Sequence, residues 1–531
     1  MNGGCVMTNK DYGEGKLPEF PESFWTNSTD LPSFPRLEQD IQVDAVIVGG
    51  GITGITTAYL LVNKGLKVAI VEADKLLNGT TGHTTAKITA QHDLIYDELL
   101  TSMGRSKARL YYEANIEALE FIKKIIEQDA IDCDFSIQDA YIYATTEEYA
   151  QKIEKEAEAY EKLHIDGKLV DAIPLNIMVR NALIMRNQAQ FHPLKYLQHL
   201  VKSITEKGGL IFENTVAVNV ETGTQPTVLT RDGGRVTANH VLVCSHFPFY
   251  EGLGLYSARM YAERSYVLAA KPKSKFPGGI YISAGKPTRS LRSVTVNGEE
   301  MILIVGENHK TGQGIDTMKL YEALEAFGQE IFGIETIPYR WSAQDLTTLD
   351  KVPYIGAITS DQPNLLIATG YRKWGMSNGT AAALLLCDTV LGEKNKFQKL
   401  YTPSRFYANP SLKSFFVENA NVVSHLIKGK LEMTNLNPNV LPKDEGAVIS
   451  IKGERKGAYR DTEGKLHIVD TTCTHIGCEV EWNSGDRSWD CPCHGSRFSY
   501  TGDVIEGPAE KPLQKYDYKM IDNLLSEDSG Y

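Results

Sequence analysis

The chain has 531 residues, 42% of them hydrophobic, and a formal net charge of −12 at pH 7. This length allows two or three domains with their own cores, and the acidic balance argues against nucleic acid or an anionic membrane as the main partner, since both need a basic surface. No apolar run approaches the roughly 20 residues of a transmembrane helix, and residues 1–20 lack the charged start and apolar core of a signal peptide. We therefore expect a cytoplasmic protein without a transmembrane segment, whose partners are small molecules or another protein.

Residues 43–72 have the pattern of a dinucleotide-binding βαβ unit. An apolar strand at 43–48 leads through glycines into a helix with apolar residues at helical spacing, and a second strand follows at 68–71. Gly49-x-Gly51-x-x-Gly54 has the spacing that permits a tight turn, close approach of a pyrophosphate and close helix packing. Glu72 ends the second strand, where a carboxylate can accept hydrogen bonds from a ribose 2′-hydroxyl. The unit predicts a dinucleotide site.

Three further segments distinguish FAD from NAD. They are LLNGTTGHTTAK at 76–87, HVLVCSHFP at 240–248, and a strand, glycine turn and helix start at 365–376. In their order they resemble the FAD-dependent amine and amino-acid oxidoreductases, the family of D-amino-acid oxidase, glycine oxidase and sarcosine oxidase, over about residues 43–400. The resemblance implies an α/β fold, α+β overall, in which a Rossmann-like FAD-binding domain is interleaved with an antiparallel-sheet substrate domain. It also implies that a helix N-terminus near Met376 points at the flavin.

The candidate FAD-binding residues come from the glycine fingerprint and from the resembling segments. They are Gly49, Gly51, Thr53, Gly54, Glu72, Thr81, Gly82, His83, Thr84, Val216, Gly370, Gly375 and Met376. GTTGHTTA also resembles the segment of dimethylglycine and sarcosine dehydrogenases in which a histidine carries the flavin covalently, and His83 falls on that position. Gly82 stands where those enzymes have tryptophan, so a histidine that only packs beside the flavin stays open.

The substrate side is less sharply defined. VGENHKTGQG at 305–314 has neither the spacing of a second dinucleotide fingerprint nor a following amphipathic helix, so we expect electrons to enter from an organic substrate. The candidates for the substrate pocket are His192, Tyr266, Tyr281, Arg289, Arg292, His309 and Lys310. Of these, His192, Arg289 and His309 join His83 as catalytic candidates, although each could equally be an ordinary structural or surface residue.

Cysteine and histidine cluster near the C-terminus. Cys473-x-His475 and Cys491-x-x-His494 offer two thiolates and two imidazoles, a set that a structural zinc ion also accepts. Zinc would not explain a further cysteine in each box, nor Gly477 and the Gly495-Ser496 pair, whose amides and hydroxyl can serve cluster sulfurs. Over about 435–520 these boxes resemble a Rieske domain.

The Rieske resemblance implies a ligand set and a disulfide. Cys473 and Cys491 would hold one iron of a [2Fe-2S] cluster, His475 and His494 the other, and Cys478 would pair with Cys493 as in cytochrome bc complexes. High-potential Rieske proteins have a tyrosine where this chain has Phe498, so we expect a less oxidising cluster. The remaining cysteines are single, as in a reducing compartment, and they are Cys5, Cys133, Cys244 and Cys387.

These patterns predict a division of the chain. We expect an extension at 1–42, FAD-binding parts at 43–95, 200–250 and 345–400, substrate parts at 96–199 and 251–344, a helical linker at 401–434 and a small all-β Rieske domain at 435–531. The linker holds one apolar stripe at helical spacing: Leu412, Phe415, Phe416, Val422, Val423, Leu426, Ile427 and Leu431. We expect it to pack on the flavin domain or between modules, with membrane-surface binding as the alternative.

The two cofactors together predict a function. FAD takes two electrons from a carbon next to nitrogen or oxygen, and a [2Fe-2S] cluster carries one. We predict oxidation of an amine or amino-acid-like substrate, with electrons passing from FAD through the cluster to an acceptor protein or quinone. The alternatives are flow from an external donor through the cluster to the flavin, and a redox sensor or electron-transfer adaptor. A Rieske oxygenase is excluded because its Asp-x-x-His-x-x-x-x-His signature is absent.

Overall fold

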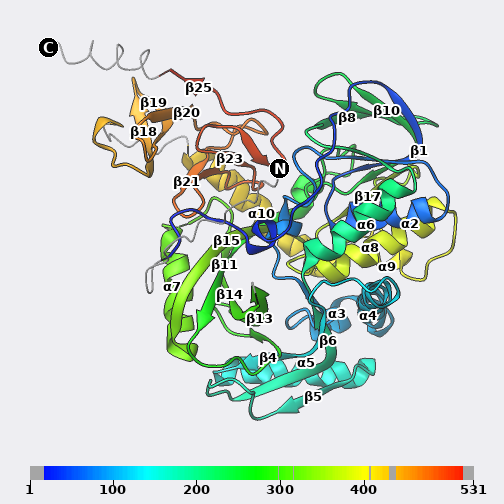
Figure 1. Cartoon of the computed structure of the whole chain (residues 1–531), viewed down its shortest axis with the longest axis vertical. Coiled ribbons are helices and arrows are strands. Elements are labelled where there is room, and N and C mark those ends of the chain that lie inside the picture. Colours follow the sequence, from blue (N-terminus) through cyan, green and yellow to red (C-terminus); the bar gives the residue numbers. More distant parts are fainter. Residues whose placement is uncertain (1–16, 297, 315, 406–407, 430–437, 518–531) are drawn as a thin grey trace, which may run out of the picture.

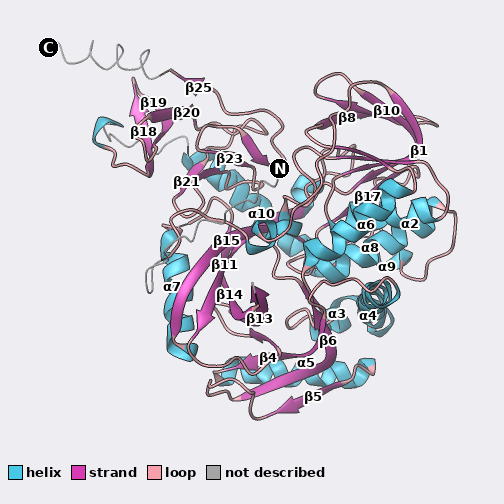
Figure 2. Ribbon diagram, viewed as in Figure 1, coloured by secondary structure: helices cyan, strands magenta, loops and turns pink. Residues whose placement is uncertain are grey.

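The computed structural model describes residues 17–296, 298–314, 316–405, 408–429 and 438–517. Within these residues the strands form two large sheets and two small ones (Figures 1 and 2). The two large sheets are built from the first 400 residues, and the two small sheets from the C-terminal module. Cys5 and Leu431 lie outside the described residues, as do the side chains of Leu412 and Ile427.

The first large sheet is the dinucleotide-binding sheet. Its order is β16-β17-β10-β1-β2-β7, and the strands from β17 to β7 are parallel. The bounds are β16 (Tyr354–Ala357), β17 (Leu365–Thr369), β10 (Arg235–Val243), β1 (Ile41–Val48), β2 (Val68–Val71) and β7 (Leu210–Phe212), with β8 (Ala217–Glu221) and β9 (Thr227–Thr230) added through β10. The central strands are buried on both faces, which is why they read as continuous apolar runs. This confirms the Rossmann-like unit.

Helices cover this sheet and hold its ligand-facing turns. Helix α2 (Ile52–Asn63) follows the glycine turn and packs on α8 (Gly375–Val390) and α6 (Pro193–Glu206), as Figure 1 shows. Helices α3 (Tyr96–Met103), α4 (Arg105–Gln128) and α5 (Glu147–Leu163) lie toward the second sheet, and α4 also contacts α8. No helix among the described residues has both the length and the apolar character needed to cross a bilayer.

The second large sheet has the order β15-β11-β14-β13-β12-β4-β6-β3. The bounds are β15 (Ile334–Thr348), β11 (Met260–Pro272), β14 (Glu299–Lys310), β13 (Ser290–Val296), β12 (Ile280–Ser283), β4 (Ser136–Ala144), β6 (Asn181–Gln190) and β3 (Lys87–Ile88), with β5 (Gly167–Val170) beside β6. Its described pairs are antiparallel except β12 with β4, which are parallel. Because nucleotide strands precede, separate and follow these strands in sequence, the two sheets are interleaved as expected.

The C-terminal module is all-β, as expected. One small sheet has the order β18 (Glu445–Ile451), β19 (Glu454–Arg460), β20 (Leu466–Asp470) and β25 (Lys515–Tyr516). The other has the order β21 (Glu481–Asn483), β22 (Ser488–Asp490), β23 (Arg497–Ser499) and β24 (Val504–Glu506). Trp489 and Phe498 are fully buried in the core beside the four clustered cysteines.

Helix α10 (Ala408–Gly429) lies between the two modules. Val422 and Leu426 pack on the C-terminal core, while the Asn419 amide donates to the Ala258 carbonyl of the larger module at 3.1 Å. This is one of the packings that the apolar stripe predicts. Phe416 and Val423 of the stripe are exposed.

Candidate functional site

A cavity of about 530 Å³ lies where the two large sheets and the C-terminal module meet. Its wall includes the ends of β1 and β2 with the turn after β1, residues of the segment 79–87, the loop 244–249 after β10, the start of α8, one face of the second sheet, and the loop 504–510 of the C-terminal module. The cavity is therefore bounded by both modules. Most of the residues that were predicted to bind FAD line this cavity.

The glycine turn is shaped to admit a ligand closely. Gly49 has a φ of 113°, and a Cβ there would lie 2.4 Å from the Cys244 carbonyl oxygen. A Cβ at Gly54 would lie 2.0 Å from the Gly49 oxygen. Helix α2 begins after Gly51, which has no side chain to cap it, and its Ile52 amide donates to the Thr81 hydroxyl at 3.1 Å. The amides that follow can donate to a phosphate. The turn fits the pyrophosphate of a dinucleotide.

Glu72 fixes the other side of this turn. Its carboxylate accepts from the Gly50 amide at 2.7 Å and from the Asp74 amide at 3.0 Å, and the residue lines the cavity. Burial raises its pKa above the usual range of a glutamate, although these two amides oppose the change. The carboxylate is thus held at the place where a ribose hydroxyl is expected.

The structure brings most of the predicted FAD-binding residues to the cavity. Those in its wall are Gly49, Gly51, Thr53, Glu72, Thr81, Thr84, Val216, Gly375 and Met376. Gly54, Gly82 and Gly370 lie behind the wall, where a Cβ would clash with Gly49, Leu77 or Thr348 respectively. These three glycines shape the site without lining it. Helix α8 begins at Gly375 without a side-chain cap and presents its positive end to the cavity.

His83 does not line the cavity. Its ring Nδ1 lies 3.0 Å from the Gly79 carbonyl oxygen, and its charged neighbours are Glu506, Arg497 and Arg264. Burial lowers the pKa of the imidazole. This placement favours the alternative in which His83 packs near the cofactor and faces the C-terminal module, and covalent attachment stays a prediction.

The other substrate-pocket candidates have structural contacts. His192 caps α6 by accepting from the Lys195 amide at 3.3 Å, Arg289 pairs with Glu307 at 2.7 Å, and His309 Nε2 lies 3.0 Å from the Tyr266 hydroxyl. The Tyr281 hydroxyl donates to Gly278, Arg292 donates to the Thr85 and Ala86 carbonyls, and Lys310 pairs with Glu418. None of these seven candidates lines the cavity. We assign none of them a contact with bound substrate.

The alternation of side chains along the strands accounts for the placement of three of these candidates. Ser265, Ser290 and Asn308 line the cavity, and each is the immediate neighbour of a residue that was favoured, Tyr266, Arg289 or His309. Successive side chains on a strand point to opposite faces of the sheet. Sequence reasoning chose the chemically conspicuous residue of each pair, and the sheet turned it away from the cavity.

Lys87 is another residue of the cavity wall that sequence reasoning missed. It lies on β3 at the edge of the second sheet, is 8% exposed, and its ammonium nitrogen is hydrogen-bonded to the Ser290 hydroxyl. Burial, with Arg292 nearby, lowers its pKa to about 7. The only signal in the sequence was a single charge next to an apolar strand, which has many ordinary explanations.

The C-terminal cysteines and histidines come together as the boxes predict. The Cys473 and Cys491 side chains share a hydrogen bond, the His475 and His494 rings are 5.1 Å apart, and Cys478 forms a disulfide with Cys493. His494 is 8% exposed, and its Nδ1 has no hydrogen-bond partner among the described residues. Two thiols, two imidazoles and an unpaired buried ring nitrogen fit a [2Fe-2S] cluster of the Rieske type.

The cavity and the cluster ligands share a wall. Gln344 lines the cavity, its amide donates to the Gly495 carbonyl at 2.9 Å, and its oxygen accepts from Thr311 at 2.7 Å. Gly495 directly follows the predicted ligand His494, and a Cβ on Gly495 would lie 2.4 Å from Ala262. The Gln344 side chain therefore contacts both the cavity and the loop that holds His494.

A buried ion network holds this junction together. Asp486 of the C-terminal module accepts from Arg264 of β11 at 2.7 Å and pairs with Arg497 at 3.1 Å, and the carboxylate is 5% exposed. The Ser342 hydroxyl donates to the same carboxylate, and Arg340 donates to the Gly485 carbonyl at 2.6 Å. The two guanidinium groups hold the pKa of Asp486 well below its usual range, against the effect of burial. The carboxylate is charged and fully paired.

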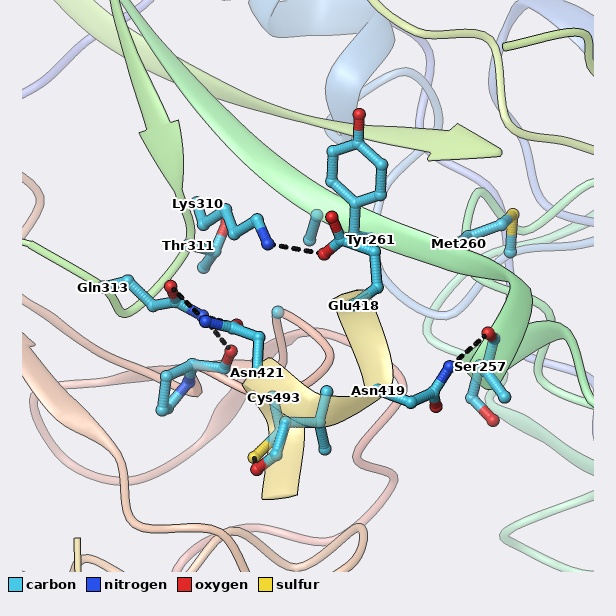
Figure 3. A pocket seen from close by; sticks show the side chains of 15 residues that line it. Ser257, Met260, Tyr261, Lys310, Thr311, Gln313, Glu418, Asn419, Asn421 and Cys493 are labelled. Carbon is cyan, nitrogen blue, oxygen red and sulfur yellow. Dashed lines mark hydrogen bonds and ion pairs between the residues drawn. The ribbon is translucent and has the colours of Figure 1, made fainter. Parts of the chain in front are cut away.

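Helix α10 adds a polar contact beside the cluster loop (Figure 3). Glu418 pairs with Lys310, and Asn421 accepts from Gln313 at 2.6 Å, while Gln313 also donates to the Pro492 carbonyl at 3.0 Å. The space between these groups is about 10 Å³, room for about one water molecule. This contact supports the packing of α10 between the modules.

The model of the family described as "FAD dependent oxidoreductase" matches residues 44–389. The chain belongs to this FAD-dependent oxidoreductase family. The oxidoreductase also matches the model of the Rieske [2Fe-2S] domain over residues 435–517. Both resemblances seen in the sequence are confirmed, and with them FAD and a [2Fe-2S] cluster as the cofactors.

Individual relatives cover one module or both. The Rieske 2Fe-2S iron-sulfur protein YhfW of Bacillus subtilis is 52% identical over 96% of this chain and 100% of its own length. The gamma-glutamylputrescine oxidoreductase of Escherichia coli is 22% identical and covers 72% of this chain and 91% of its own. The solved structure of glycine oxidase from Geobacillus kaustophilus has a TM-score of 0.59 at 17% identity, over 69% of this chain and 99% of its own. That likeness shows the fold of the larger module.

Proposed function

We propose that this oxidoreductase oxidises an amine or amino acid at FAD and passes the electrons through its Rieske cluster to an acceptor. The observation that carries the proposal is the shared wall: Gln344 and the loop 504–510 line the FAD cavity, and Gln344 also bonds to the loop that holds His494. When bound, FAD supplies two-electron chemistry and the cluster one-electron chemistry. Two sites this close suit direct electron transfer.

The number of electrons released by the substrate, and the number that the cluster carries at once, indicate what kind of acceptor is needed. Oxidation breaks a C–H bond next to the substrate nitrogen and an N–H bond, leaves an imine, and releases two electrons and two protons. The two electrons leave the protein one at a time, because a [2Fe-2S] centre carries one. A one-electron acceptor protein, or a quinone reduced in two steps, fits this exit. The names of the glutamylputrescine and glycine enzymes support an amine or amino-acid substrate.

In this proposal the chain's own residues position the FAD. Amides at the start of α2 other than that of Ile52, which donates to the Thr81 hydroxyl, would hold the pyrophosphate. Glu72 would accept from the ribose, and the start of α8 at Gly375 would place its positive end toward the flavin. Cys473, His475, Cys491 and His494 hold the cluster, and the Cys478–Cys493 disulfide ties their loops together.

The division of the chain belongs to the proposal as well. We keep an FAD module at 43–400, a helical linker at 401–434 and a Rieske module at 435–531. A cytoplasmic location is supported by Cys133, Cys244 and Cys387, which are buried and not disulfide-bonded.

Anaerobic mixing of the holoenzyme with N-methylated amines and amino acids tests the direction of flow. We expect bleaching of the flavin absorbance, followed by the paramagnetic signal of the reduced cluster. A cluster signal that forms only after an external reductant is added, with no flavin bleaching by any substrate, would contradict the proposal. That result would favour flow from a donor through the cluster to the flavin.

A further inference from the structure

Residues 18–28 form an N-terminal segment that precedes the residues matched by either family model, and it contacts the wall of the FAD cavity. The Ser23 hydroxyl donates to the Gly82 carbonyl at 2.6 Å, and the Trp25 indole donates to the Thr84 carbonyl at 2.7 Å. Ser23 is 1% exposed and Trp25 is fully buried. Both hydrogen bonds are therefore shielded from water, where an unpaired carbonyl is costly.

Five successive carbonyl groups beside the cavity, from Gly82 to Ala86, accept hydrogen bonds from side chains. The donors are Ser23, Trp341, Trp25 and, for the last two carbonyls, Arg292. Two of these four donors belong to the N-terminal segment. Because Thr84 and Thr85 line the cavity, the direction of these carbonyls determines which backbone groups the segment 82–86 presents to FAD.

The first residues of the N-terminal segment contact the C-terminal module. The Glu19 carbonyl accepts from Arg487 of that module and from Arg340 of β15, each at 2.7 Å. Arg340 also donates to the Gly485 carbonyl at 2.6 Å, and the centroid of the Phe20 ring lies 4.1 Å from the guanidinium carbon of Arg487. The segment therefore contacts both modules at their junction.

The middle of the N-terminal segment is anchored by aromatic packing on the larger module. The centroid of the Phe24 ring lies 5.5 Å from that of His192 and 5.8 Å from that of Tyr339. The Ser28 hydroxyl lies 3.0 Å from His192 Nε2, and the Tyr339 hydroxyl donates to the Asn27 side chain at 3.1 Å. His192 thus holds this segment in place.

We propose that the N-terminal segment 18–28 is a clasp that positions both cofactor sites. Ser23 and Trp25 are positioning residues for FAD, and they act through the carbonyls of Gly82 and Thr84. Glu19 and Phe20 hold the C-terminal module in its docked place through their contacts with Arg487. The clasp acts whichever way electrons flow, so this inference goes beyond the proposed function and does not depend on it.

Trp25→Phe and Ser23→Ala test the FAD end of the clasp. Each removes one donor and keeps most of the packing, so that a carbonyl beside the cavity loses its partner. The measurement is the rate of FAD release from the diluted holoenzyme, followed by the rise of FAD fluorescence. We expect release about threefold to tenfold faster than in the wild type, since one buried hydrogen bond is worth up to about tenfold in an equilibrium constant.

Tyr256→Phe is the matched control for the FAD end. Tyr256 is fully buried, its hydroxyl donates to the Ile358 carbonyl at 2.7 Å, and neither residue lines the cavity. This variant loses the same kind of hydrogen bond, so it should unfold at a lower temperature and still release FAD at the wild-type rate. Release from Trp25→Phe and Ser23→Ala that is no faster than from Tyr256→Phe would overturn this half of the inference. If Trp25→Phe does not fold, Ser23→Ala decides.

Phe20→Ala tests the docking end of the clasp. Phe20 is 51% exposed, so its removal costs little core packing. The Gly485 amide of the C-terminal module donates to the Thr317 hydroxyl of the larger module at 2.7 Å, so its hydrogen exchange reports opening of the junction. We expect exchange at Gly485 about twofold to fivefold faster in Phe20→Ala, the worth of an exposed cation–π contact. Phe416→Ala, which removes an exposed ring from α10, is the control and should exchange at the wild-type rate. Equal exchange in the two variants would overturn the docking half of the inference.

Neither measurement requires a substrate, so the outcomes separate this inference from the proposed function. Failure of every amine and amino acid to reduce the flavin would reject the proposed function and leave both results as they are. Wild-type FAD release and wild-type exchange in all three clasp variants would reject the clasp while the proposed function stands.

Discussion

At the scale of single residues, burial determines the protonation state of several side chains of this protein. Burial keeps His92 neutral: its pKa is lowered to about 3, the ring bonds to Tyr111, Thr89 and Ser377, and it stacks on Trp374 in the cavity wall. Burial likewise disfavours the charge of Lys87 and lowers its pKa to about 7. At this scale, exclusion of water decides which groups carry charge.

His92 should make stability depend on pH. Its folded pKa of about 3 lies below the usual 6.5, so its contribution is fully present above pH 6.5 and is lost as pH falls toward 3. Each unit in that window costs about 1.4 kcal/mol. We expect urea unfolding of the wild type to lose about 1 kcal/mol more stability than His92→Gln between pH 6.5 and 5.5, because the unfolded histidine is already half protonated at pH 6.5. An identical pH dependence in both proteins would contradict a neutral buried His92.

Phe498 should hold the cluster potential low. The side chain is fully buried in the Rieske core, and a phenyl ring cannot donate a hydrogen bond to a cluster sulfur. Phe498→Tyr should raise the midpoint potential by about 60 mV, since 1.4 kcal/mol corresponds to 59 mV for one electron. Redox titration followed by the cluster's paramagnetic signal measures it, and an unchanged potential would show that the hydroxyl does not reach the cluster.

At the scale of elements, two features determine which residues line the cavity. They are the turn between β1 and α2, and the alternation of side chains along β11, β13 and β14. The turn needs glycine because its backbone passes close to Cys244. The alternation sends Ser265, Ser290 and Asn308 to the cavity, and their neighbours to the opposite face. A one-residue shift of register would exchange these sets completely.

Gly49→Ala should abolish tight FAD binding. The added Cβ would lie 2.4 Å from a backbone oxygen, at a φ that side chains rarely adopt, so the turn has to leave the conformation that fits a pyrophosphate. The matched control is Gly65→Ala after α2, where φ is 84° but the space is open. The control should lose about 1 kcal/mol of stability and keep its flavin. The flavin-to-protein absorbance ratio of the purified variants measures the difference, and full flavin content in Gly49→Ala would disprove this account of the turn.

The whole molecule depends on how the two modules dock. Loop 504–510 completes the cavity of the larger module, and α10 packs against both modules beside the cluster loop. The buried pairs of Arg264, Asp486 and Arg497 lie at this junction. The docking of the two modules therefore sets the distance between the FAD cavity and the cluster-binding loops.

Asp486→Asn should loosen the docking. Removing the carboxylate charge breaks two buried ion pairs and leaves Arg264 with Glu506 at 3.6 Å and Arg497 with Asp490 at 3.1 Å. Breaking a buried pair typically costs about 3–5 kcal/mol, and we expect a loss at the lower end of this range because these carboxylates remain. We expect a lower thermal unfolding temperature, and cluster reduction by flavin at least tenfold slower than in the wild type. Asp503→Asn, whose exposed carboxylate pairs with Lys515, is the control and should change neither. Unchanged rates and unfolding in Asp486→Asn would show that this network does not hold the modules.

The sequence by itself determined the features that short spacings encode. The turn from Gly49 to Gly54, Glu72 at a strand end and the two boxes from Cys473 to His494 each place backbone or ligand atoms within a few residues, so local geometry suffices. Only the tertiary structure decided which strand face lines the cavity, that Lys87 meets Ser290, and that the loop 504–510 closes the FAD site. These contacts join residues far apart in the chain, and they depend on strand register, sheet curvature and module docking, which no short pattern specifies.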